Sequence, residues 1–386
     1  MKRKSSKSLF RKVIGFLHLW LGLISGIIVF ILSITGCLFC FQQEISNVTY
    51  KKVFTVQPQQ TQQLPLNFLQ EKAQTALGKN QPINYITAYK DSTKAWEFMA
   101  YKTNDTALTY FGSIEYFRSA FINPYTGAVT GIRDYKYDFF NIIKYMHWSL
   151  LLKNDIGQPI AGWGTLIFVV LLITGLVLWY PKKWNRSTKK QAFTVKWKAK
   201  FKRVNYDLHN VFGFYALLLA LILGLTGMVF SFQWFSNFLY AVASASTTPP
   251  AYTESSSDTT QNINLKAIDI AYTKALKQLP EAKSYNISPP YNNKAVIGIF
   301  GYNKEGVYYN ADELRFDQYS GKLLYRKNYT EKNNGEKMID MNYDIHVGAV
   351  GGITGKIIAF IISFICASLP VTGFLVWWNK GRKLTA

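Results

Sequence analysis

Cysteine is scarce in this chain, and its placement excludes a disulfide-stabilised extracellular domain. The 386 residues include only Cys37, Cys40 and Cys366, and all three lie within apolar blocks. The two long polar segments, 42–140 and 236–345, contain no cysteine and therefore no disulfide framework. We interpret the three cysteines as small buried apolar side chains.

Charged residues are missing from four long apolar blocks. None of the four contains Asp, Glu, Lys or Arg, and they cover residues 13–41, 161–180, 211–235 and 357–378. A transmembrane helix needs roughly 20 apolar residues. One such block is compatible with a buried helix of a soluble protein, but four in one chain are not. The sequence therefore predicts an α-helical integral membrane protein with four transmembrane helices.

Acidic residues number 22 against 44 basic residues, and the excess of positive charge is concentrated. Residues 1–12, 181–203 and 380–386 together hold 19 basic residues and no acidic one. This is the positive-inside pattern, which predicts that these segments and both termini lie in the cytoplasm. The net charge of +22 then reflects topology and contact with the lipid bilayer, not nucleic-acid binding.

The chain carries the same pattern twice. Histidine precedes a Thr-Gly pair by 17 residues at His18–Thr35 and His209–Thr226, by 27 at His147–Thr174, and by 26 at His346–Thr372. The polar segments match as well, with Asn-Pro-Tyr-Thr-Gly at 123–127 against Asp-Gln-Tyr-Ser-Gly at 317–321. We predict two internal repeats of the same orientation, each a span outward, an external module and a span back.

Each external segment has the pattern of one helix followed by strands. Helical spacing of apolar residues covers 66–78 and 263–279. Alternating, aromatic and β-branched runs predict strands at 94–102, 114–122 and 126–132, and at 283–288, 294–301 and 313–325. These are expected to be small α+β modules.

The predicted organisation along the chain follows from these patterns. It consists of a cytoplasmic N-terminus with the first helix (1–41), module 1 (42–140), a lead-in helix with the second span (141–180), a basic loop (181–203), the third span (204–235), module 2 (236–340), and a lead-in with the fourth span and tail (341–386).

The chain has only four histidines, and topology assigns each a depth. His18 and His209 open outward-running helices near the cytoplasmic face, whereas His147 and His346 precede inward-running helices near the outer face. Two pairs at two levels suit two bis-histidine haems in a helix bundle. Cys-x-x-Cys-His is absent, so such haems are expected to be non-covalent. A bare metal ion and purely structural histidines are the alternatives.

Residues near the histidines were assigned roles on the same reasoning. Both inner histidines read His-x-x-x-Gly, and Gly22 and Gly213 are expected to leave room for a flat macrocycle. Basic residues expected to pair with haem propionates are Arg11, Lys12, Lys202 and Arg203. The outer pair has glycines near His346 only, at 348, 351 and 352.

The sequence resembles the PepSY-associated transmembrane helix family, the iron-regulated membrane proteins that include integral membrane siderophore reductases. The resemblance covers nearly the whole chain and depends on Asp207-Leu-His209, Ile345-His-Val-Gly348, the Thr-Gly pairs, the Trp-rich span exits and the two PepSY-type hairpins. It implies PepSY-like periplasmic modules, two b-type haems held by His18, His147, His209 and His346, and a place in the bacterial cytoplasmic (inner) membrane. The chain departs from the family at His147, where Met146 replaces the usual leucine and the nearest following glycine is Gly157.

The resemblance also implies an activity, the reduction of a periplasmic ferric siderophore with release of ferrous iron. No Gly-x-Gly-x-x-Gly nucleotide motif is present. A separate electron donor, a flavoprotein or a quinol, is therefore expected. Two rival functions stay open at this point. One is a non-enzymatic PepSY module that binds a peptide or protease, and the other is a transporter.

Overall fold

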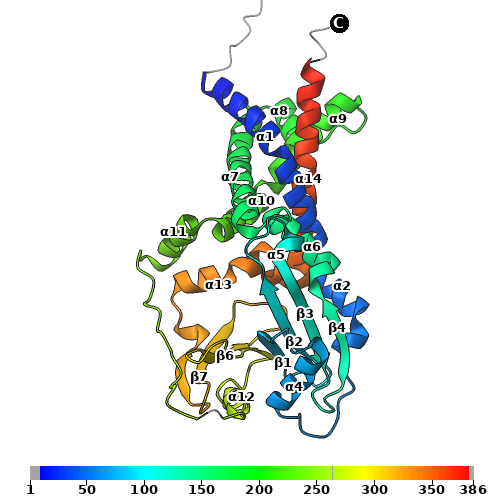
Figure 1. Cartoon of the computed structure of the whole chain (residues 1–386). Coiled ribbons are helices and arrows are strands. Elements are labelled where there is room, and N and C mark those ends of the chain that lie inside the picture. Colours follow the sequence, from blue (N-terminus) through cyan, green and yellow to red (C-terminus); the bar gives the residue numbers. More distant parts are fainter. Residues whose placement is uncertain (1–8, 263, 382–386) are drawn as a thin grey trace, which may run out of the picture. The chain divides into compact units, whose positions relative to one another are not determined.

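The computed structural model describes residues 9–262 and 264–381, which form two compact units (Figure 1). The membrane unit comprises residues 9–40, 143–236 and 345–381, and the sheet unit comprises residues 41–142 and 237–344. Residues 1–8 and 382–386, which belong to the predicted cytoplasmic termini, lie outside the described residues. Residue 263, the expected first residue of a helix, lies outside them too.

Within the described residues, four helical stretches are long and apolar enough to cross a membrane. They are Leu9–Phe39 (α1), Asn154–Trp179 (α7), Phe201–Ser231, made of α9 (Phe201–Asp207), the π-helical turn η2 (Leu208–Phe212) and α10 (Gly213–Ser231), and Ala349–Asn379, made of η4 (Ala349–Gly351) and most of α14 (Gly352–Gly381). These helices indicate a multi-pass membrane protein, as the sequence predicts.

The four spans close into a ring of helix pairs. α1 packs against α7 and α14, and α10 packs against the same two helices. Small residues allow close approach, because a Cβ at Gly164 would lie 2.6 Å from Cγ2 of Ile28, and one at Gly224 would lie 2.9 Å from Cγ2 of Val169. Close backbone approach at glycine is how membrane helices gain packing energy without a hydrophobic driving force.

The sheet unit is built on one antiparallel sheet of eight strands. Its order is β4-β3-β2-β1-β5-β6-β7-β8. The strands are β1 (Tyr85–Tyr89), β2 (Trp96–Thr103), β3 (Ile114–Ile122), β4 (Val129–Asp134), β5 (Ser284–Ser288), β6 (Val296–Tyr302), β7 (Ala311–Asp317) and β8 (Leu323–Lys327). The central pair joins the two polar segments, with Ile86 opposite Ile287 and Ala88 opposite Tyr285.

One hydrophobic core serves both polar segments. Helices α4 (Leu66–Leu77) and α12 (Ala267–Gln278) cover the same face of the sheet (Figure 1). The ring of Tyr272 on α12 lies 5.5 Å from that of Trp96 on β2 and 5.6 Å from that of Tyr285 on β5. The sequence predicted two small modules, whereas these segments share one sheet and one core.

Two strand predictions differ from the structure. β1 was not predicted, because its five residues form only a short run. It pairs with β2, the next strand along the chain, and with β5, about 200 residues later. The single strand expected over 313–325 is instead the hairpin of β7 and β8. Its turn contains Gly321 with φ of 63°, the conformation expected at the Tyr-Ser-Gly step.

Short helices complete the chain. They are α2 (Gln42–Thr49), α3 (Lys51–Phe54), α5 (Tyr110–Ser113), η1 (Tyr135–Tyr137), α6 (Phe139–Ser149), α8 (Arg186–Phe193), α11 (Gln233–Ser244), η3 (Tyr329–Glu331) and α13 (Asn334–His346). α7 begins five residues after the end of α6, and α14 begins six residues after the end of α13.

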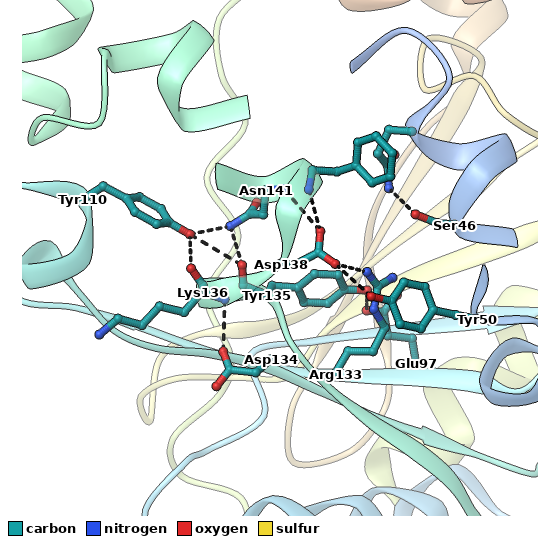
Figure 2. A network of polar contacts seen from close by, with 12 residues as sticks. Ser46, Tyr50, Glu97, Tyr110, Arg133, Asp134, Tyr135, Lys136, Asp138 and Asn141 are labelled. Carbon is teal, nitrogen blue, oxygen red and sulfur yellow. Dashed lines mark hydrogen bonds and ion pairs between the residues drawn. The ribbon is translucent and has the colours of Figure 1, made fainter. Parts of the chain in front are cut away.

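A buried polar network fixes the start of α6 in the sheet unit (Figure 2). The carboxylate of Asp138 pairs with the buried guanidinium of Arg133 and accepts the backbone N–H of Phe140 and Asn141. The guanidinium of Arg133 also lies 3.8 Å from the ring centroid of Tyr50. Asn141 donates to the hydroxyl of Tyr110 at 2.9 Å. Asp138 thus acts as a helix cap and as the counter-charge of a buried cation.

Asp138→Asn is expected to destabilise the chain by about 3 kcal/mol, because a buried cation loses its counter-charge while the capping oxygen remains. The control is Asp134→Asn, since Asp134 is exposed and accepts only the backbone N–H of Lys136 among the contacts described. Thermal unfolding in detergent should separate the two by several degrees. Equal melting temperatures would show that the Arg133–Asp138 pair contributes little.

Candidate functional site

The inner pair of histidines lies at one end of the membrane unit. His18 is on α1 and His209 is in the π-helical turn η2. Their ring centroids are 6.3 Å apart, with 80° between the ring planes.

The turn that carries His209 is braced by a buried carboxylate. A π-helical turn holds one extra residue and re-aims the side chains that follow it, and such turns are frequent at functional sites. Asp207, immediately before the turn, is fully buried. It accepts hydrogen bonds from Nε of Arg203 at 3.0 Å and from the backbone N–H of Lys196 at 3.1 Å. Asp207 in the Asp-Leu-His sequence therefore stabilises the turn through these hydrogen bonds.

The outer pair lies where two short helices end. His147 is in the last turn of α6, and His346 is the last residue of α13. Their ring centroids are 5.9 Å apart. After His147 the chain reverses through Leu150 and Leu151, which have φ of 55° and 59°. Gly157, distant in sequence from His147, packs directly on the backbone of Ser149. A glycine of the next helix therefore packs closely on the end of α6.

Each histidine contacts a Thr-Gly pair on a span from the same half of the chain. The Nδ1 atom lies within hydrogen-bonding distance of a threonine Oγ1 in all four cases: His18–Thr174 at 2.9 Å, His147–Thr35 at 3.1 Å, His209–Thr372 at 3.0 Å and His346–Thr226 at 2.9 Å. The constant spacing between histidine and Thr-Gly is visible in the sequence, but it does not predict these contacts of the threonines.

The glycine of each pair lets the imidazole lie on the helix backbone. A Cβ added at the glycine would meet Cε1 of the histidine at 3.3 Å for Gly175 and His18, 3.5 Å for Gly36 and His147, 3.1 Å for Gly373 and His209, and 3.5 Å for Gly227 and His346. Each Thr-Gly dipeptide therefore binds one histidine: the threonine lies within hydrogen-bonding distance of the imidazole, and the glycine leaves space for the ring.

Gly373→Ala is expected to push the ring of His209 away from Thr372, because a contact of 3.1 Å is too close for a Cβ. If the inner pair holds a haem, its retention should fall roughly tenfold, the usual effect of disturbing a residue that orients a ligand. The control is Gly213→Ala, whose Cβ would lie an ordinary 3.6 Å from Cδ2 of Leu369. Haem per chain after gel filtration measures both. Greater damage from Gly213→Ala would make the glycine on the histidine's own helix the critical one.

Three basic residues expected at haem propionates have other partners. Arg11 donates to the carbonyls of Val177 and Tyr180 at the end of α7, and Lys202 donates to that of Asn379 near the end of α14. Arg203 pairs with Asp207. Cations at helix C-termini satisfy carbonyl groups that have no partner within their helix. These residues therefore connect helix ends, and their assignment to haem propionates stays a prediction.

The spacing of the two pairs fits a metal bound between two imidazoles. Metal–imidazole bonds are about 2 Å long, so two rings on opposite sides of one iron have centroids about 6 Å apart. The two observed separations match that value. Within the described residues, no group of three or more His, Cys, Asp or Glu side chains is placed to hold a metal ion. Two nitrogen donors per site suit a cofactor that supplies its own equatorial ligands.

One comparison with known proteins gives a match. A family model described as the PepSY-associated TM region matches residues 16–380, which is nearly the whole chain and includes all four histidines. No curated protein matches the sequence.

Proposed function

The chain belongs to the PepSY-associated TM region family, and on that premise we propose that it is a di-haem reductase of the bacterial cytoplasmic membrane. Its substrate is a ferric siderophore in the periplasm, and its product is ferrous iron. The observation that carries the proposal is the meeting of all four histidines in two pairs, at centroid separations of 6.3 and 5.9 Å. A structural role for single histidines does not account for two such pairs.

The residues of the chain have defined tasks in this proposal. His18 and His209 hold one non-covalent haem b, and His147 and His346 hold the other. A bound haem supplies a one-electron Fe(III)/Fe(II) couple. The two levels are joined by α1, because the 17 residues from His18 to Thr35 correspond to about 25 Å of helix. The two sites thus lie near opposite faces of a hydrocarbon layer of about 30 Å.

The two halves of the chain are, in this proposal, repeats of one unit. Three correspondences support it. The His–Thr contacts recur in both halves. Arg11 in the first half and Lys202 in the second half both donate hydrogen bonds to carbonyl groups near the end of a membrane-spanning helix. Each half also contributes four consecutive strands to the sheet, which meet at the β1–β5 pair. The repeats run in the same direction, so their axis is parallel to the membrane normal.

Charge supports a cytoplasmic location for the basic loop at 181–203 and for both termini. A tag at either terminus or within 185–195 is expected to be inaccessible in intact spheroplasts. Cysteines introduced at Asn104 or Ser256, in the polar segments, should react with an impermeant maleimide from outside. The parent chain is the control for labelling of the native cysteines, of which Cys37 and Cys366 are buried and Cys40 is partly exposed. The opposite labelling pattern would invert the topology and exchange the two histidine levels.

The activity is tested in sealed proteoliposomes. A reductant is trapped inside, with a ferric siderophore and a ferrous-specific dye outside. Ferrous iron should appear outside only when the chain is present, one electron being consumed for each iron reduced. A His18→Ala/His209→Ala variant should reduce the rate to that of protein-free liposomes. A wild-type rate no higher than that background would refute the reductase proposal.

The chemistry of siderophores explains why reduction releases iron, and the lack of a nucleotide motif bears on the electron donor. Siderophore oxygen donors are hard ligands that hold ferric iron far more tightly than ferrous iron, so reduction releases the metal. The absence of a nucleotide motif makes the donor a separate flavoprotein or quinol.

A further inference from the structure

We propose that Thr35, Thr174, Thr226 and Thr372 are positioning residues that hold every histidine as the Nδ1–H tautomer, with the lone pair on Nε2. The inference rests on the proposed function for the identity of the bound group, but the tautomer follows from hydrogen bonds within the chain. The histidines meet in pairs, and a metal between them needs an unprotonated nitrogen from each ring.

Each threonine hydroxyl donates its only proton to a backbone carbonyl of its own helix. Each hydroxyl donates to the backbone carbonyl four residues earlier on its own helix: Thr35 to Ile31 at 2.6 Å, Thr174 to Val170 at 2.8 Å, Thr226 to Ile222 at 2.7 Å and Thr372 to Ser368 at 2.9 Å. A hydroxyl has one O–H donor and two acceptor lone pairs. Toward the imidazole, the threonine oxygen is therefore an acceptor.

The proton between threonine and histidine must then belong to the ring. An acceptor oxygen 2.9–3.1 Å from Nδ1 requires Nδ1–H. A second contact agrees, because Nδ1 of His147 lies 2.8 Å from the carbonyl oxygen of Leu32, which has no proton to give.

The glycine and the threonine act together on the ring. The glycine removes the Cβ that would push Cε1 away, so Nδ1 reaches the helix surface where the threonine oxygen and the backbone carbonyl lie. With Nδ1 and Cε1 against that helix, Nε2 is left as the only ring nitrogen for a ligand. Acceptors at Nδ1–H also make the imidazole a stronger electron donor, which favours ferric over ferrous iron.

A purely structural role is the competing explanation, because threonines in membrane helices often bond to the carbonyl four residues earlier. Substitution distinguishes the two. Thr372→Val keeps the β-branched shape but removes the acceptor, and Thr372→Ser keeps the acceptor. If the acceptor matters, the serine variant resembles wild type and the valine variant does not. If only shape matters, the valine variant is the milder of the two.

The first measurement is the midpoint potential of each haem in the purified full-length chain. Thr372→Val is expected to weaken ferric binding relative to ferrous binding up to tenfold at the inner site, which raises that potential by up to about 59 mV. Thr372→Ser should stay close to wild type, and the outer haem should not change in either variant. Thr226→Val should instead raise the potential of the outer haem and leave that of the inner haem unchanged. This variant provides the test if Thr372→Val does not fold. Unchanged potentials in the valine variants would overturn the positioning role.

The second measurement needs neither a variant nor a cofactor. The full-length chain, labelled with 15N-histidine, expressed without added haem and purified through a histidine-free tag, has only four imidazoles to resolve. Nitrogen chemical shifts should show a protonated Nδ1 and an unprotonated Nε2 in all four. Signals of the Nε2–H tautomer, or averaging between tautomers, would overturn the inference. A chain that binds no haem but shows four Nδ1–H signals would refute the proposed function and leave the tautomer assignment intact.

Discussion

His209→Ala is expected to lower the haem content from about two per chain to about one. His18 lies opposite His209, so an iron between them loses one of its two protein ligands and is no longer retained firmly. Adding His18→Ala should remove little more, because residues of one site act as a unit and their effects are strongly non-additive. Combining His209→Ala with His346→Ala should instead remove both haems, since these residues belong to different pairs.

Haem per chain across the single and double variants is the measurement, with Thr372→Ser as a control that leaves all four imidazoles in place. The result that contradicts this wiring is specific. If His18→Ala with His346→Ala removed only one haem, those two histidines would share a site, and both the depth assignment and the two levels would be wrong.

Gly355→Ala is expected to prevent folding of the membrane unit or to reduce the folded yield severely. A Cβ there would lie 2.1 Å from the carbonyl oxygen of Gly348, a backbone atom that cannot rotate away as the end of a flexible side chain can. Gly348 itself has φ of 77°, in the left-handed region that favours glycine. The clash lies two residues after His346, whose contact with Thr226 depends on this passage of the chain. The expected cost exceeds the ~3 kcal/mol typical of overpacking.

The matched control is Gly351→Ala, four residues earlier, where an added Cβ would have no neighbour within 4 Å. Fluorescence-detected gel filtration in detergent measures the folded yield of both. Gly157→Ala is the equivalent change at the other histidine, because its Cβ would lie 1.8 Å from the carbonyl oxygen of Ser149. Equal yields of Gly355→Ala and Gly351→Ala would mean that the chain passes from α13 to α14 by another path.

The four membrane-spanning helices were predicted well because the length of an uninterrupted apolar segment is enough to identify such a helix. It also grouped His18 with His209 and His147 with His346 by depth, and the structure places those rings together; that they hold haem stays a prediction. The threonine contacts were missed although the constant spacing to Thr-Gly was visible. Spacing along a helix gives depth, but which face of α7 meets α1 depends on how the helices pack.

Two further features have no local signal in the sequence. The pairing of β1 with β5 joins segments about 200 residues apart, and hydrophobic alternation says nothing about which strands pair. The contacts of Arg11 and Lys202 are the second feature, because packing brings helix ends close enough for their carbonyl groups to accept hydrogen bonds from these side chains. In both cases the partners are set by the tertiary structure and not by the local sequence.

The most direct test of the central claim is the haem content of the wild-type chain, expressed with sufficient haem and purified in detergent. Absorption spectra of the oxidised and dithionite-reduced protein, with a pyridine haemochrome assay for stoichiometry, give both the ligation and the number of haems. The two histidine pairs predict a red protein with a low-spin b-type spectrum and about two haems per chain. A colourless protein, or one whose haem content stays far below one per chain, would contradict the account and favour a membrane-anchored module that binds a peptide or protease.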